Sequence, residues 1–103
     1  MKKIIDGKRY NTETAELVAE WSNGYDCNDF KHCSEDLYRT PKGAWFIHGA
    51  GGAMSKYAQP CGDMTGGGSD ITPLSAAVAR EWLENKDFVD EMEAYFGDQI
   101  EDA

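Results

Sequence analysis

The segment EDLYRTPKGAWFIHG, residues 35–49, restricts the possible folds of this chain more than any other. Two runs rich in β-forming residues flank Pro41 and Gly43, which favour a tight turn because proline presets φ and glycine tolerates a left-handed conformation. Alternation places large apolar residues on both faces of the runs: Leu37, Trp45 and Ile47 on one face, Tyr38 and Phe46 on the other. We therefore expect a central antiparallel hairpin, at about residues 35–49, whose two faces are at least partly covered.

Three further segments predict strands, the first of them a small N-terminal ribbon. KKIIDGKRYN carries at its centre the Asp-Gly pair that is typical of a tight hairpin turn. TETAELVAEWSNG contains good helix formers, but the apolar residues alternate along Glu16–Ser22, which favours a strand that ends at the Asn-Gly pair. ITPL predicts a short strand that Pro73 confines to a sheet edge or a strand end. The sequence thus predicts a small antiparallel sheet of three to five strands.

The apolar spacing changes after residue 74 from two residues to three or four, which predicts helices. Ser75 is the expected N-cap of a helix at about residues 75–84, and Asp87 the expected N-cap of a second helix at about 87–96. Strands followed by helices are typical of an α+β fold, and a chain of 103 residues suits a single domain. The residues expected to face the core are Val78, Trp82, Ala79 or Leu83, Phe88, Met92, Tyr95 and Phe96.

Glycines gather at two places, and neither matches a nucleotide-binding motif. Gly49, Gly51 and Gly52 leave the predicted hairpin, but no third fingerprint glycine and no Gly-Lys-Ser/Thr sequence follows. These glycines are expected to let the chain bend as it leaves the sheet. The glycine-rich segment at about residues 59–70 predicts a flexible loop.

Negative charge is concentrated at the C-terminal end. The chain has a formal net charge of −9, yet from Glu81 onward nine acidic residues stand against Lys86 alone. We predict that outward carboxylates there bind a protein with a basic nucleic-acid-binding surface, because their spacing resembles that of phosphates about 6 to 7 Å apart. An ordinary solvated helix surface fits the same pattern equally well. The predicted partner-binding residues are Glu84, Asp87, Asp90, Glu91, Glu93, Asp98, Glu101 and Asp102.

The remaining chemistry predicts a non-enzymatic protein without a cofactor. No serine lies in a Gly-x-Ser-x-Gly context, and neither histidine has a spacing that marks it as a base. Cys27, Cys33 and Cys61 are odd in number and form no C-x2-C pair, so we expect reduced thiols and no metal site, with a zinc site as the alternative. The short apolar runs and the polar opening predict a cytoplasmic protein that does not enter a membrane.

Basic residues cluster near the other end of the chain. Lys2, Lys3, Lys8 and Arg9 lie beside Tyr10, a grouping that is weakly indicative of nucleic-acid contact. The acidic net charge opposes such contact, so no direct binding of nucleic acid is expected.

Three stretches, YNTETAELVAEWSNGY, LYRTPKGAWFIHGAGGAMSKYA and ITPLSAAVAREWLE, resemble a family of small, mostly uncharacterised proteins encoded by bacteria and phages. The resemblance covers most of the chain and implies a mobile-element protein, a group that includes anti-CRISPR inhibitors; it assigns no catalytic residue. The first functional hypothesis is therefore an inhibitor of a CRISPR effector in the host cell that uses the acidic C-terminal face. The second is a regulatory binding module that uses the sheet around Trp45, His48, Tyr57 and the Gly49–Gly52 bend.

Overall fold

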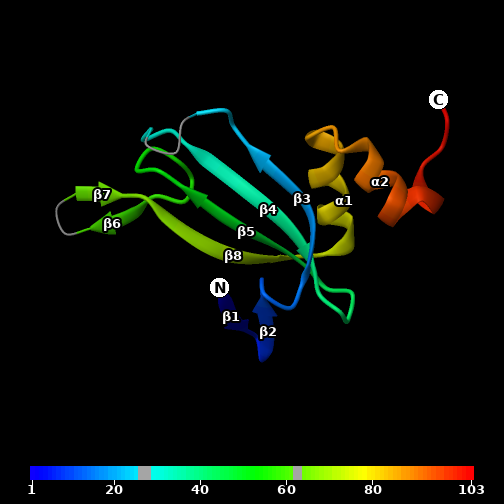
Figure 1. Cartoon of the computed structure of the whole chain (residues 1–103), viewed down its shortest axis with the longest axis horizontal. Helices are drawn as coiled ribbons and strands as arrows, with labels where there is room; N and C mark the ends of the chain where they lie inside the picture. The colour runs from blue at the N-terminus through cyan, green and yellow to red at the C-terminus, as the bar shows by residue number, and fades with distance from the viewer. Residues whose placement is uncertain (26–28, 62–63) are drawn as a thin grey trace.

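The protein is described by a computed structural model that covers residues 1–25, 29–61 and 64–103. Its main element is a four-stranded antiparallel sheet in the order β3-β4-β5-β8, with helices at one end (Figure 1). The fold is α+β, as the order of strands and helices in the sequence predicts. The sheet strands are β3 (Glu16–Ser22), β4 (Cys33–Arg39), β5 (Trp45–Gly51) and β8 (Gly68–Leu74).

The predicted central hairpin is confirmed as β4 and β5. Tyr38 pairs with Phe46, and the turn between the strands is closed by a bond of 2.8 Å from Thr40 N to Ala44 O. Gly43 has φ +86, the left-handed conformation expected of it. The strand at Glu16–Ser22 is also confirmed. These elements form locally because residues that favour a turn lie next to runs in which apolar residues alternate.

β8 confirms the edge strand predicted at ITPL and is longer than predicted. It pairs with β5 on one side only, and Pro73 lies opposite Phe46. An edge position suits proline because its nitrogen has no hydrogen to donate to a second neighbour.

The predicted flexible loop at 59–70 is wrong as a secondary-structure assignment for the described residues. β6 (Gln59–Cys61) and β7 (Met64–Gly66) pair with each other, and β8 begins at Gly68. A Cβ on Gly68 would lie 2.6 Å from the carbonyl oxygen of Tyr57, and one on Gly67 2.7 Å from that of Gly51. These glycines permit backbones to approach closely, which composition alone cannot distinguish from flexibility.

The N-terminal segment forms the predicted hairpin, β1 (Lys2–Ile5) and β2 (Lys8–Asn11). Asp6 and Gly7 have φ values of 51 and 76, as a tight hairpin turn requires. Tyr10 from this hairpin packs edge to face on Phe46, with ring centroids 5.6 Å apart, and both contact Ile71 in a small core. Because Phe46 alternates with Trp45 and Ile47, this core lies on the opposite face of the sheet from the main one.

The C-terminal part contains α1 (Ala76–Asn85), α2 (Val89–Phe96) and the short 3-10 helix η1 (Gly97–Gln99). Ser75 caps α1 as predicted, and its hydroxyl accepts a bond of 3.2 Å from Val78 N. Asp87 does not cap α2, contrary to expectation. It has φ +59 and follows α1 in a Schellman motif, in which its own N–H bonds to Glu84 O and the next N–H bonds to Leu83 O.

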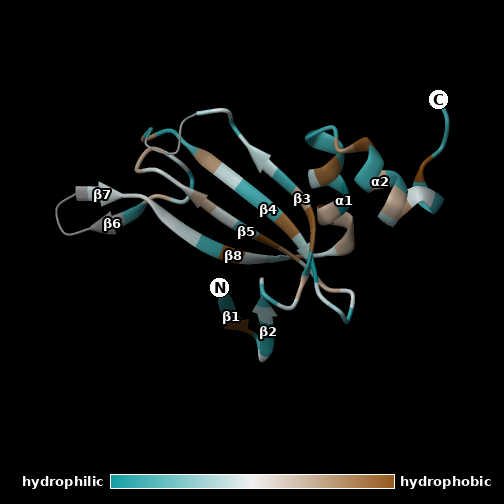
Figure 2. Ribbon diagram, viewed as in Figure 1, coloured by the Kyte–Doolittle hydropathy of each residue, from teal (hydrophilic) through white to brown (hydrophobic). Residues whose placement is uncertain are grey.

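The main core lies between the sheet and the two helices. Trp45 stacks on Phe96, with ring centroids 5.3 Å apart, and Leu37 and Leu83 are completely buried. Val78 is 45% exposed, so its predicted place in the core is wrong. Figure 2 shows apolar residues gathered where β3, β4 and β5 pass close to α1. In the parts of the chain that the structure describes, no helix is long and apolar enough to cross a membrane.

Candidate functional site

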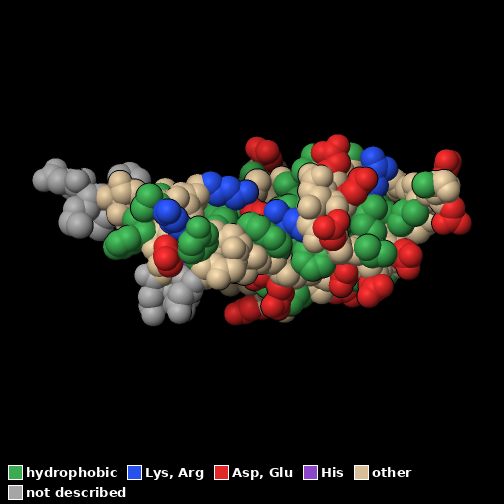
Figure 3. Space-filling view, turned by 90° about the horizontal axis from the view of Figure 1, so that it is seen from above, with side chains coloured by type: hydrophobic (Ala, Val, Ile, Leu, Met, Phe, Trp, Pro, Cys, Tyr) green, Lys and Arg blue, Asp and Glu red, His purple; other side chains and the backbone are tan. Residues whose placement is uncertain are grey.

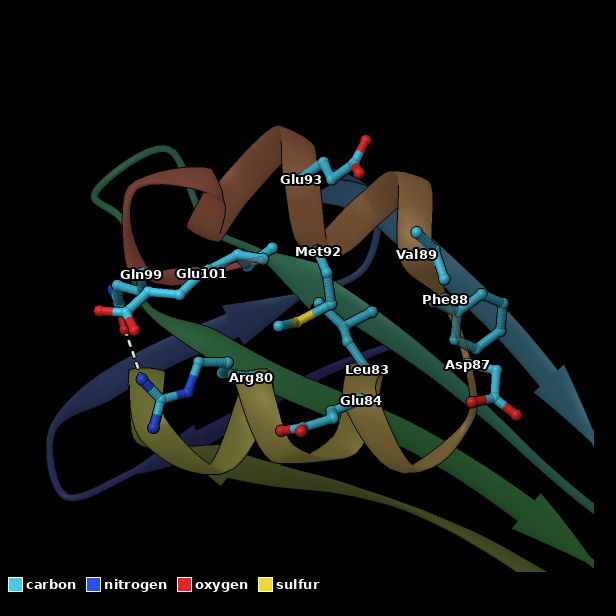
Figure 4. A pocket seen from close by; sticks show the side chains of 11 residues that line it. Arg80, Leu83, Glu84, Asp87, Phe88, Val89, Met92, Glu93, Gln99 and Glu101 are labelled. Atoms are coloured by element: carbon cyan, nitrogen blue, oxygen red, sulfur yellow. Dashed lines mark hydrogen bonds between the residues drawn. The ribbon is translucent and has the colours of Figure 1, made fainter. Parts of the chain in front are cut away.

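A groove of about 560 Å³ lies between α1, α2 and the C-terminal segment (Figure 4). Leu83 of α1 and Met92 of α2 meet at its base. Val89 and Ile100, which also line it, are 61% and 42% exposed. The groove therefore offers water an apolar surface that the fold itself does not cover.

The sequence shapes this groove at both ends. The Schellman motif at Asp87 reverses the chain, and Phe88 then stacks on Trp82 with ring centroids 5.5 Å apart. At the other end Arg80 Nη1 donates a bond of 2.5 Å to Gln99 Oε1, which ties η1 to α1. Both helices are thus fixed relative to one another without filling the space between them.

Carboxylates surround the apolar base of the groove. Four of the eight predicted partner-binding acids line it, namely Glu84, Asp87, Glu93 and Glu101. Arg80 is the one basic residue in the lining. Within the described ranges, the ion pairs involve only Asp70 and Glu35 as acids, so none of these four carboxylates is neutralised by a lysine or arginine.

The other four predicted acids do not join this rim. Asp90, Asp98 and Asp102 are exposed but lie outside the groove lining, and Glu91 is only half-exposed. Figure 3 shows acidic side chains on more than one side of the helical end. The expectation that the predicted acids share one outward face of the helices is therefore wrong. Successive residues of a helix point about 100° apart, so Glu91 and Glu93 flank Met92 on opposite sides.

The aromatic residues of the second hypothesis are not free to anchor a partner. Trp45 is only 6% exposed because it forms part of the main core. Tyr57 is half-buried over Gly49, where a Cβ would lie 1.9 Å from the Tyr57 ring. His48 is half-buried on β5 opposite Asp36. The predicted exposed aromatic surface on the sheet is thus wrong.

A buried carboxylate, which the sequence analysis missed, explains the position of Tyr57. Glu35 is 3% exposed, and its Oε2 accepts bonds from Tyr57 OH at 2.5 Å and Lys56 Nζ at 2.7 Å. Its Oε1 accepts a bond of 3.1 Å from Trp82 Nε1 and lies 3.8 Å from Lys86 Nζ. The sequence does carry a signal for this burial, because Glu35 is two residues before Leu37 on the strand, which places both side chains on the same face.

The surroundings of Glu35 make it a structural group rather than a base. Burial raises its pKa, but the bonds from Lys56, Tyr57 and Trp82 outweigh that effect and leave the pKa below its ordinary value. Burial and the bond to Glu35 raise the pKa of Tyr57 in turn. A low-pKa carboxylate whose two oxygens are occupied has little capacity to accept a proton.

Of the three cysteines, the structure describes the side chain of Cys33. Cys33 is buried, and burial followed by the nearby Glu35 charge raises the pKa of its thiol. Cys27 and the side chain of Cys61 lie outside the described part of the structure. Among the described residues, no group of three or more His, Cys, Asp and Glu side chains could hold a metal ion.

Comparison of the chain with protein-family models, curated proteins and solved structures finds no match.

Proposed function

We propose that this protein is a non-enzymatic inhibitor of phage or mobile-element origin, which binds a basic nucleic-acid-binding protein in the host cytoplasm through the groove between α1 and α2. A CRISPR effector is the partner class that the sequence resemblance favours. The observation that carries the proposal is the combination of two exposed apolar side chains in the groove, Val89 and Ile100, with four carboxylates that lack an ion-pair partner in the described structure.

The apolar base favours binding over simple solvation of the helices. Acidic residues alone would keep a helix surface soluble, and such a surface would have no need of exposed Val89 and Ile100. Charge at the rim of an interface steers the partner and sets specificity, whereas apolar contacts at its centre supply most of the affinity. The groove has carboxylates at its rim and apolar side chains between them.

Lysine and arginine side chains match the groove in shape as well as charge. Their aliphatic stems can lie on Val89 and Met92 while their charged ends reach Glu84 and Glu93 at the rim. Such side chains line the channels in which proteins hold nucleic acid, because each neutralised phosphate contributes to binding. An inhibitor that occupies them competes with the nucleic acid.

Charge reversal at the groove tests the proposal against a matched control. The test variant is E84K/E93K, and the control is D90K/D98K, which changes the net charge equally at exposed positions outside the lining. Purified guide-loaded CRISPR effectors would be assayed for target-DNA binding by gel shift with each protein added. We expect inhibition by the wild-type protein and the control, a loss of at least about tenfold for E84K/E93K, and weaker inhibition as salt rises.

Two results would contradict the proposal. Equal inhibition by E84K/E93K and wild type would reject the groove as the binding surface. Failure of the wild-type protein to restore phage plaques on CRISPR-bearing hosts would reject the role as an inhibitor.

A further inference from the structure

A second hollow, of about 540 Å³, lies between β2 and the turn that joins β4 to β5. It is on the N-terminal hairpin side of the sheet, whereas α1 and α2 cover the other face. Its size falls within the range of about 300 to 1,000 Å³ that is typical of small-molecule sites. It is therefore separate from the groove and large enough for a ligand of its own.

The charged residues that line this hollow all have the same sign. Lys8, Arg9 and Lys42 line it, and no aspartate or glutamate does. This is notable in a chain with 19 acidic and 10 basic residues. Within the described residues, carboxylates pair with Lys3, Lys56 and Lys86 but with none of the three cations in the hollow. The hollow is thus a positive region of an acidic protein, and its charge is available to a ligand.

The wall of the hollow is rigid and partly apolar. Tyr10, which is 7% exposed, is held by its edge-to-face contact with Phe46. Ala44 lies beside it in the lining, and its N–H bonds to Thr40 Oγ1 at 3.0 Å. The turn that carries Lys42 is closed by the bond of 2.9 Å from Gly43 N to Thr40 O. Folding therefore fixes the backbone that carries each cation before a ligand arrives.

We infer that this hollow binds an organic phosphate of nucleotide size. The phosphate would lie between Lys8, Arg9 and Lys42, and the ring would lie against Pro41 and Ala44. Arginine can bind a phosphate with two parallel hydrogen bonds, and lysine contributes a compact charge. An inorganic anion would leave the apolar wall uncovered, so the wall favours a ligand that also carries a ring. This inference goes beyond the proposed function and is independent of the groove.

Titration of the ¹⁵N-labelled protein with three probes tests the inference. The probes are adenosine 5′-monophosphate, adenosine and inorganic phosphate, which separate the contributions of ring and charge. We expect saturable amide shifts in residues 7–11 and 40–44 with the monophosphate, and binding at least about tenfold weaker with either fragment, since a hydrogen bond to a charged group alone is worth that much.

Two double variants of equal charge change locate the site. K8Q/K42Q removes two cations from the hollow, whereas K2Q/K31Q removes two at exposed positions that line neither the hollow nor the groove. The first should weaken monophosphate binding at least about tenfold, and the second less than about threefold. The same spectra show whether each variant is folded. Equal affinity of the two variants, equal affinity for the monophosphate and inorganic phosphate, or no saturable shift in the two segments would each overturn the inference.

Discussion

Replacement of Glu35 by glutamine removes the charge that joins three parts of the fold. The Glu35 carboxylate on β4 is bonded by Lys56 and Tyr57 of the segment after β5 and by Trp82 of α1. Glutamine has nearly the same shape, so E35Q creates no cavity, but only one of its two terminal atoms accepts hydrogen bonds. The variant therefore isolates the contribution of the charge and of one acceptor.

The expected loss of stability follows from the individual contacts. In the least costly arrangement the amide oxygen keeps the bond from Trp82, and the amide NH₂ faces the Tyr57 hydroxyl, which can turn to accept. The side chain of Lys56 is 63% exposed and returns to water at little cost. The side chain of Lys86 is 19% exposed, and its Nζ lies 3.8 Å from the Trp21 ring centroid. Its partly buried charge loses the nearby carboxylate that offsets the cost of burial. The bonds with Tyr57 and Trp82 become neutral ones, and together with the cost at Lys86 this amounts to about 2 to 3 kcal/mol at pH 7.

The loss should depend on pH in a defined direction. The pKa of Glu35 in the folded protein lies below its ordinary value of 4.5, so its stabilisation is complete above that pH and is lost as the pH falls through the folded-state pKa. Glutamine does not titrate. The difference in unfolding free energy between wild type and E35Q should therefore be largest near neutral pH and shrink in acid.

Urea unfolding followed by tryptophan fluorescence, at neutral pH and again well below pH 4, measures this difference. The control is E13Q at an exposed position, which should change stability by less than about 0.5 kcal/mol. A neutral-pH value for E35Q as small as that of the control would refute the argument, and so would a large difference that persists unchanged in acid.

Three other predictions use single sites. G49A should destabilise by more than about 2 kcal/mol because the new methyl group meets the fixed Tyr57 ring, whereas G97A, with φ −56 and nothing within 4 Å, should stabilise by about 0.4 to 1 kcal/mol; thermal unfolding checks both. S75A should cost about 1 kcal/mol in the same assay, since it removes the α1 cap. In a C27S/C61S background, the Cys33 thiol should react with a disulfide reagent far more slowly in the native state than in urea, because it is buried and its pKa is raised.

The two proposed sites carry opposite charges and lie on opposite sides of the sheet. The acidic groove is formed by α1 and α2 on one face, and the basic hollow is formed by the N-terminal hairpin and the β4–β5 turn on the other. The sheet thus separates two surfaces whose chemistry suits different ligands, a basic protein and an organic phosphate. Since no residue lines both, each can be tested by variants that leave the other intact.

The sequence by itself determined the α+β class, the central hairpin with Gly43 at its turn, the strand Glu16–Ser22 and the cap at Ser75. These features depend on residues close together in the chain, where φ preferences and apolar alternation act directly. The tertiary structure alone decided that the glycines near Gly68 serve close packing, and that the C-terminal acids divide between the groove and the surface around it. It also brought Lys42 to Lys8 and Arg9. Such outcomes depend on which distant segments pack together, and no local spacing encodes that.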